Sequence, residues 1–183
     1  MPINFIVNDP RAGNAAPPMR QKKPRPDRPA TKSGLNLFNV PAESVQPPGS
    51  PDFLFWQCRE GALAALEAFE KCAGPHRFWQ GNRRKLDLLP NEGDNLNAFY
   101  DRFSFSFFES AQGNATFFSG ASTDVVAHEV GHGLLDAMRP EFWSVANIEA
   151  DSFHESFGDC IGVLTALNDK ETRLALLAAA IGV

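Results

Sequence analysis

The chain has 183 residues, 43% of them apolar, and is long enough to bury one core without disulfide bonds. Its net charge of −5 argues against a nucleic-acid-binding protein. The N-terminal residues do not have the pattern of a secretory signal and no apolar run could span a membrane, so the default expectation is a cytoplasmic protein, with secretion left open. The three cysteines form no CxxC spacing, and Cys160 is expected to be a small buried residue on a helix face.

Residues 1–50 differ in composition from the rest of the chain. Ten of the 14 prolines lie between Pro10 and Pro51, and seven of the 17 basic residues lie between Arg11 and Lys32. Because proline removes backbone donors and apolar residues are scarce here, we expect an irregular Pro-rich basic arm. Its stretch RQKKPRPDR fits either a solvated arm or a docking site for an anionic partner or a peptide. The folded domain is expected over residues 51–183.

The first half of this domain should contain one helix followed by short strands. The run from residue 53 to 73 reads as a helix that Gly74 and Pro75 bring to an end. KLDLLP, beginning at Lys85, is a strand candidate. In the next segment Phe103, Phe105 and Phe107 alternate with serines, as in a half-buried strand. QGNATFFSGAS then predicts a loop, with a short strand at 116–118.

Three helices are predicted in the remaining sequence. The first begins at Ser122 or Thr123, either of which is a suitable N-cap, and ends before Pro140. The second begins near Ser144 or Asn147 and ends near Leu167, and the third opens with Asn168 as its N-cap. The third is apolar, so a partner or a further domain is expected to dock there. The second carries an apolar stripe that consists of Phe153, Phe157, Ile161 and Leu164.

The strongest chemical signal is the sequence AHEVGH at residues 127–132. On a helix, His128 and His132 lie about one turn apart on the same face, so that one nitrogen of each can bind a single zinc ion. Glu129 lies beside His128 and can act as a general base toward a water activated by the metal. The opposite face of the helix is apolar and should be buried; it consists of Val126, Val130 and Leu134.

The third zinc ligand has to come from farther along the chain, because the extended pattern HExxHxxGxxH is broken at both of its later positions. On the next predicted helix Glu155 and Asp159 lie four residues apart on one face. We assign Glu155 to zinc and Asp159 to the free ring N–H of His128, a bond that fixes the tautomer and orientation of that imidazole. His154, about a quarter-turn away, is the alternative ligand.

Three segments together resemble the thermolysin family of zinc peptidases and the related fungalysins. They are NAFYDR from Asn97, FFSGASTDVVAHEVGHGLLDA from Phe117 and EADSFHESFGD from Glu149, and the resemblance extends over residues 85–168. The resemblance implies a mixed α+β, zincin-like metallopeptidase domain. In such a domain, the edge strand of a small sheet packs over a pair of active-site helices.

The resemblance also implies roles for individual residues in the hydrolysis of internal peptide bonds. It implies that His128, His132 and Glu155 bind zinc, that Glu129 is the general base, and that Asp159 is the hydrogen-bond partner of a ligand. It places Asn97 and Ala98 at positions that hold the backbone of a peptide or protein substrate.

The sequence departs from the family in one major respect. The family's second, helical domain supplies a histidine for the oxyanion and an arginine for the substrate, and this sequence ends before such a domain. We therefore expect zinc binding with slow cleavage. The alternative is a non-catalytic, zinc-stabilised binding domain or a truncated peptidase-like protein.

Overall fold

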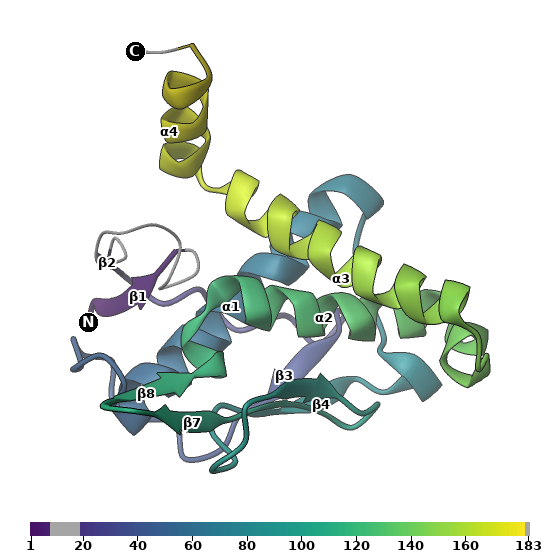
Figure 1. Ribbon diagram of the computed structural model, residues 1–183, viewed down its shortest axis with the longest axis horizontal. Coiled ribbons are helices and arrows are strands. Elements are labelled where there is room, and N and C mark those ends of the chain that lie inside the picture. The colour runs from purple at the N-terminus through teal and green to yellow at the C-terminus, as the bar shows by residue number, and fades with distance from the viewer. Residues whose placement is uncertain (8–18, 182–183) are drawn as a thin grey trace.

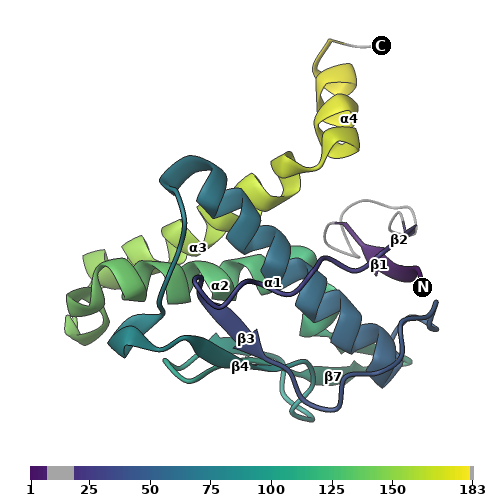
Figure 2. The same cartoon turned by 180° about the vertical axis from the view of Figure 1, so that it is seen from behind.

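The computed structural model describes residues 1–7 and 19–181, and its architecture is mixed α+β with small sheets. Helices α1 and α2 lie along one side of the main sheet, and α3 packs against α2 (Figures 1 and 2). The strands are β1 (Ile3–Ile6), β2 (Met19–Lys22), β3 (Gly34–Asn36), β4 (Lys85–Leu89), β5 (Ala98–Tyr100), β6 (Ser104–Phe107), β7 (Glu109–Gln112) and β8 (Ala115–Phe118). The α-helices are α1 (Pro51–Ala73), α2 (Thr123–Met138), α3 (Ile148–Asn168) and α4 (Lys170–Ile181).

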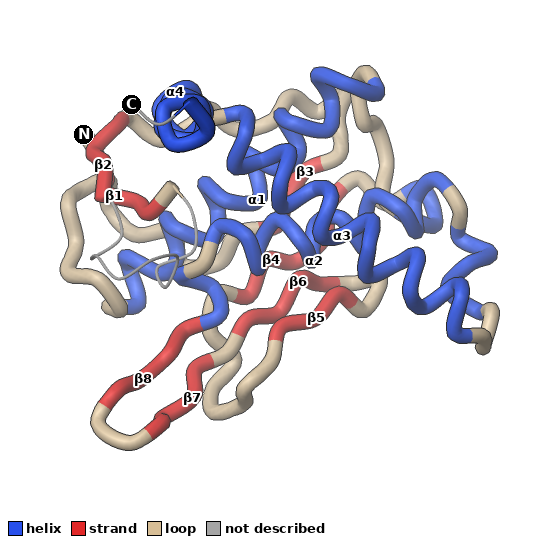
Figure 3. Tube along the Cα trace, turned by 45° about the horizontal axis from the view of Figure 1, so that its top comes forward, coloured by secondary structure: helices blue, strands red, loops and turns tan. Residues whose placement is uncertain are grey.

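The main sheet has the strand order β3-β4-β6-β5. Strands β3, β4 and β6 are parallel, whereas β5 pairs antiparallel with β6 and forms one edge of the sheet (Figure 3). Phe105 and Phe107 on β6 are fully buried. The prediction of a half-buried strand is wrong here, because Ser104 and Ser106 are buried as well. Their hydroxyl oxygens lie 2.9 Å apart in a hydrogen bond, which offsets the loss of water.

Residues 1–7 and 19–50 contain three strands and pack against the main sheet and the helices, so this described part of the predicted arm is not separate from the fold. Strand β3 belongs to the main sheet and places Leu35 in the main core. Ile3 packs against Phe55 and Trp56 of α1. The apolar residues of this segment are divided between the two environments: Ile3, Ile6, Val7 and Leu35 are buried, whereas Met1, Met19, Phe38, Val40 and Val45 are exposed. Residues 8–18 of the predicted arm lie outside the described residues.

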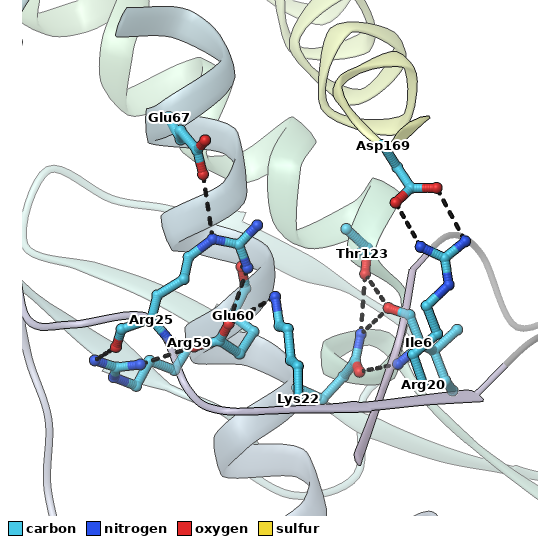
Figure 4. A network of polar contacts seen from close by, with 10 residues as sticks. Ile6, Arg20, Lys22, Arg25, Arg59, Glu60, Glu67, Thr123 and Asp169 are labelled. Atoms are coloured by element: carbon cyan, nitrogen blue, oxygen red, sulfur yellow. Dashed lines mark hydrogen bonds and ion pairs between the residues drawn. The ribbon is translucent and has the colours of Figure 1, made fainter. Parts of the chain in front are cut away.

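The basic residues of this segment form ion pairs with the helices. Glu60, on α1 and only 1% exposed in its side chain, contacts Lys22 at 3.0 Å, Arg25 at 2.8 Å and the adjacent Arg59 at 2.8 Å (Figure 4). Arg20 contacts Asp169, between α3 and α4, at 2.5 Å. A buried carboxylate needs such partners, because an unpaired charge in the interior is strongly destabilising. The basic stretch is therefore part of the folded structure.

The four helices occur where the sequence predicts them, with clear caps. Ser50 accepts a hydrogen bond from Phe53 N–H at the start of α1, and Ser122 and Asn147 cap α2 and α3 in the same way. The predicted cap of α4 is wrong by one residue. Asp169, rather than Asn168, accepts the N–H of Thr172 at 2.8 Å. The apolar face of α2 is fully buried as predicted, at Val126, Val130 and Leu134.

Helix α3 is less buried than its sequence suggests. Ile161 packs into the main core, but Phe153 is 49% exposed and Leu164 is 39% exposed, so the predicted stripe is only partly covered. Cys160 is exposed, which corrects the prediction of a buried thiol. Helix α4 stands away from the rest of the fold (Figure 1). Over the described residues, no helix is both long and apolar enough to cross a membrane.

Candidate metal centre

Helices α2 and α3 bring four of the predicted site residues together. Nε2 of His128 lies 3.2 Å from Oε2 of Glu155, and Nε2 of His132 lies 3.7 Å from Oε1 of the same carboxylate. On the other side of the His128 ring, Nδ1 lies 2.9 Å from Oδ1 of Asp159. The contact expected between His128 and Asp159 is therefore present, and Glu155 faces both imidazoles.

Glu129 occupies the inner wall of the same site. One carboxylate oxygen of Glu129 and one nitrogen each of His128 and His132 lie within 4.8 Å of one another. Glu129 is 7% exposed, and its carboxylate accepts a hydrogen bond from the backbone N–H of Tyr100 on β5. Burial raises the pKa of Glu129 to about 7, against the opposing effect of the nearby His128. A carboxyl group with this pKa can both accept and release a proton near neutral pH.

A cavity of about 480 Å³ opens in front of these residues. It lies between β5, α2, α3 and a 3₁₀ turn at Pro140–Ser144. Asn97 and Ala98 both line it, so the structure brings the two residues implied by the resemblance to the predicted centre. The side-chain oxygen of Asn97 accepts the N–H of Ala98 at 2.9 Å. The remaining lining residues are Phe99, Tyr100, His128, Glu129, His132, Phe142, Trp143, Asp151, His154 and Glu155.

The donor atoms lie close enough together to hold a metal ion. Bonds of about 2.0–2.1 Å to nitrogen and oxygen in a tetrahedral zinc site place neighbouring ligand atoms roughly 3.4 Å apart. The two nitrogen–oxygen distances to Glu155, 3.2 and 3.7 Å, lie on either side of that value. Burial, together with the nearby His128, lowers the pKa of His132 to about 4. The imidazole of His132 is therefore neutral at pH 7, which is the form that binds metal.

Both Glu129 and Glu155 lie close enough to the two imidazoles to be considered as the third ligand. Glu155 is the better candidate, because its two oxygens face the two Nε2 atoms directly. Glu129 also lies within reach of both imidazoles, and its carboxylate is held by the backbone N–H of Tyr100 on β5. Between Glu155 and His154, the contacts of the Glu155 oxygens with the two Nε2 atoms, at 3.2 and 3.7 Å, favour Glu155.

Two glycines that sequence reasoning missed allow the helices to approach each other. A Cβ atom on Gly131 of α2 would lie 2.7 Å from Cα of Gly158 on α3. A Cβ atom on Gly158 would lie 2.9 Å from Cε1 and Nδ1 of His128. Distances under 3.0 Å are essentially never found for real Cβ atoms. The two glycines thus determine how close Glu155 comes to the imidazoles, and no local sequence signal distinguishes them from other helical glycines.

A buried polar cluster fixes β5 against α2 and was also missed. Asp136 on α2 is fully buried and accepts hydrogen bonds from the Tyr100 hydroxyl at 2.9 Å and from Arg102 at 2.9 and 2.6 Å. A buried aspartate on an apolar helix is costly without such partners. The position of Asp136 on an apolar helix could therefore have predicted that this residue has a polar partner. The sequence does not identify the partner.

A second cavity, of about 530 Å³, adjoins the first at Asn97. Its walls are mostly apolar and come from the β7–β8 hairpin, the start of α2 and the start of α1, with Phe53, Phe117 and Val125 among them. The cavity is large enough to receive an apolar side chain of a bound molecule.

Neither a protein-family model nor a curated protein sequence matches the chain. What the site can do chemically therefore follows from its own geometry and donor atoms.

Proposed function

We propose that the protein is a zinc-dependent endopeptidase that hydrolyses internal bonds of extended peptides. The observation that carries the proposal is the convergence of two imidazole nitrogens and the Glu155 carboxylate at one point, with the buried carboxylate of Glu129 beside it. Three protein ligands and an open fourth side are typical of catalytic zinc sites, whereas structural sites usually have four protein ligands.

The residues of the centre have separate tasks in this reaction. Zinc supplies Lewis acidity, which lowers the pKa of a bound water to about 7 and polarises the scissile carbonyl. Glu129 accepts a proton from the attacking water as its oxygen bonds to the carbonyl carbon. Glu129 then passes this proton to the amide nitrogen as the carbon–nitrogen bond breaks, which leaves a carboxylic acid and an amine.

Strand β5 and the apolar cavity support a peptide as the substrate. The described strands leave the outer edge of β5 unpaired, and an extended peptide can add to such an edge through backbone hydrogen bonds. Because Asn97 borders both cavities, a peptide along β5 can place its scissile bond near Glu129 and an apolar side chain in the second cavity.

Substitution of Glu129 tests the proposed chemistry. The Glu129→Gln protein should bind zinc as the wild type does but lose peptidase activity, because an amide cannot accept the water proton. Activity is measured on zinc-loaded protein with a fluorogenic peptide library, with and without a chelator. Asp151→Asn is the matched control, since Asp151 lines the same cavity and loses the same charge. Unchanged turnover in Glu129→Gln would remove Glu129 from the mechanism.

A non-catalytic zinc-binding domain is the second candidate, and one observation favours it. No arginine or lysine is among the residues that line the described cavity, so positive side chains do not face a developing oxyanion. Loss of one oxyanion donor lowers kcat by roughly a hundred- to a thousandfold. We therefore expect slow peptide cleavage. Stoichiometric zinc binding without any chelator-sensitive cleavage would favour the binding domain.

A further inference from the structure

Two buried ring nitrogens at the metal centre have no hydrogen-bond partner among the described residues. They are Nδ1 of His132 on α2 and Nε2 of His154 on α3. The centroids of the two rings lie 5.6 Å apart, and their planes are inclined by 42°. His154 is only 9% exposed, and water is excluded from both nitrogens. A buried polar atom without a partner costs about 1–3 kcal/mol, so two of them on neighbouring rings call for an explanation.

The two nitrogens are chemically complementary. When Nε2 of His132 directs its lone pair at a metal, the ring proton has to be on Nδ1, which makes Nδ1 a donor. Neutral His154 offers an acceptor at Nε2 when its own proton is on Nδ1. Two imidazoles joined by an N–H···N bond of about 2.9 Å have centroids roughly 5 Å apart. The observed centroid distance of 5.6 Å is thus about half an ångström longer than in such a pair.

We propose that His154 is a positioning residue of the metal centre, whose Nε2 accepts a hydrogen bond from Nδ1–H of His132 and thereby directs Nε2 of His132 at the zinc ion. The inference rests on the proposed function, because only a metal-binding His132 needs this tautomer. His154 then does for His132 what Asp159 does for His128. The choice of acceptor follows solvent exposure: Asp159 is 76% exposed in its side chain and can stay charged, whereas a buried site favours a neutral imidazole.

The proposal separates His154 from the role of metal ligand. The carboxylate of Glu155 already faces both Nε2 atoms, at 3.2 and 3.7 Å. The ring centroid of His154 instead lies 5.6 Å from that of His132 and 6.1 Å from that of Trp143. His154 thus adjoins the ring of a proposed ligand, as a hydrogen-bond partner does.

The test compares His154→Phe with His154→Gln. Phenylalanine keeps a ring but has no acceptor, whereas the amide oxygen of glutamine reaches the place of Nε2. Zinc affinity, measured by competition with a chromogenic chelator, should fall about 10- to 100-fold in His154→Phe and stay close to the wild-type value in His154→Gln. Trp143→Phe is the control for altered packing around His154 and should leave the affinity unchanged.

A second readout does not depend on any variant. Long-range ¹H–¹⁵N NMR of the zinc-loaded wild type should show His132 as the Nδ1–H tautomer with a hydrogen-bonded proton, and His154 as the Nδ1–H tautomer whose Nε2 carries no proton and accepts that hydrogen bond. A protonated His154, or His132 bound to zinc through Nδ1, overturns the proposal.

The outcomes also separate this inference from the proposed function. Wild-type affinity in His154→Phe overturns the role of His154 alone. An equally large loss in His154→Phe and His154→Gln, matching that of His132→Ala, makes His154 a ligand and overturns the inference as well. Failure of the wild type to bind zinc overturns both the inference and the proposed function.

Discussion

Glu155 and Asp159 are the more exposed residues of the candidate metal centre. Their side chains are 67% and 76% exposed, whereas those of His128 and His132 are 21% and 15% exposed. Water competes with hydrogen bonds between exposed charged groups and weakens them. Water weakens a bond between a ligand and a metal less than it weakens a hydrogen bond. Loss of Glu155, the proposed ligand, should therefore reduce zinc affinity more than loss of Asp159, the proposed hydrogen-bond partner.

Substitution of single residues should reveal this difference. After dialysis, mass spectrometry should find zinc in the wild type but not in His132→Ala or Glu155→Ala, since each has lost one of three ligands. Asp159→Asn should retain zinc with an affinity lower by about tenfold, the low end of the usual range for partners of ligands. Full zinc occupancy in Glu155→Ala would move the third ligand to another residue, with Glu129 and His154 as the nearest candidates.

At the scale of elements, the centre depends on how closely α3 lies against α2. Gly158 on α3 contacts the His128 ring without a side chain between them, and Gly131 on α2 meets Gly158. The distance between the two helices therefore determines whether Glu155 reaches both imidazoles. An added methyl group at this contact has to displace the ring of a ligand or the helix that carries Glu155 and Asp159.

Gly158→Ala should lower zinc affinity about tenfold, as expected when the orientation of a ligand is disturbed. Alanine is more favourable in a helix than glycine by about 1 kcal/mol, which opposes the steric cost of the added methyl group. The thermal stability of the metal-free protein should therefore change little. Gly162→Ala is the matched control on the same helix. Its Cβ would meet only a carbonyl oxygen of Asp124 at 3.6 Å, an ordinary contact. An equal effect of both substitutions on zinc binding would contradict the role of the close approach.

For the whole molecule, the segment before α1 and the segment after it are joined at His76. The backbone carbonyl of His76 accepts the N–H of Ser33 at 3.0 Å, and its N–H donates to Glu70 on α1 at 2.8 Å. Its ring is buried between Phe69 and Trp79, and Nε2 has no partner among the described residues. Burial lowers the pKa of His76 to about 4. Its protonation is therefore linked to global unfolding.

The sign of this linkage follows from the two pKa values. The unfolded chain takes up the His76 proton near pH 6.5 and the folded protein near pH 4, so this residue makes stability fall as the pH drops between these values. The loss is at most about 3 kcal/mol. In urea titrations of metal-free protein, His76→Phe should reduce this pH dependence. Phe69→Leu is the control: it should lower stability equally at each pH. The same pH dependence in His76→Phe would contradict the assignment.

Local patterns in the sequence were sufficient to predict the helices and the pair of imidazoles on α2. Ser122, Asn147 and the spacing of His128 and His132 act within one or two helical turns, and the predicted helices are confirmed. The facing of Glu155 and Asp159 toward the imidazoles also follows from their positions on α3. Their roles as zinc ligand and partner remain predictions.

Contacts between distant segments could not be predicted in this way. The ion pairs of Glu60 with Lys22 and Arg25 join residues more than thirty positions apart, and composition alone made their segment look unstructured. Similarly, Asp136 meets Arg102 only after β5 has docked on α2. Ser104 and Ser106 are buried together with Phe105 and Phe107, although the alternation of serine and phenylalanine predicts that the serines are exposed.

The open edge of β5 also has a consequence for the behaviour of the protein in concentrated solution. Backbone amides and carbonyls are the same in every polypeptide, so an edge that accepts an extended peptide accepts a strand of another copy equally well. Phe99, 37% exposed on this strand, offers such a neighbour an apolar contact. Self-association at high protein concentration would then compete with substrate for one surface, and a short peptide bound along β5 would keep the molecules apart.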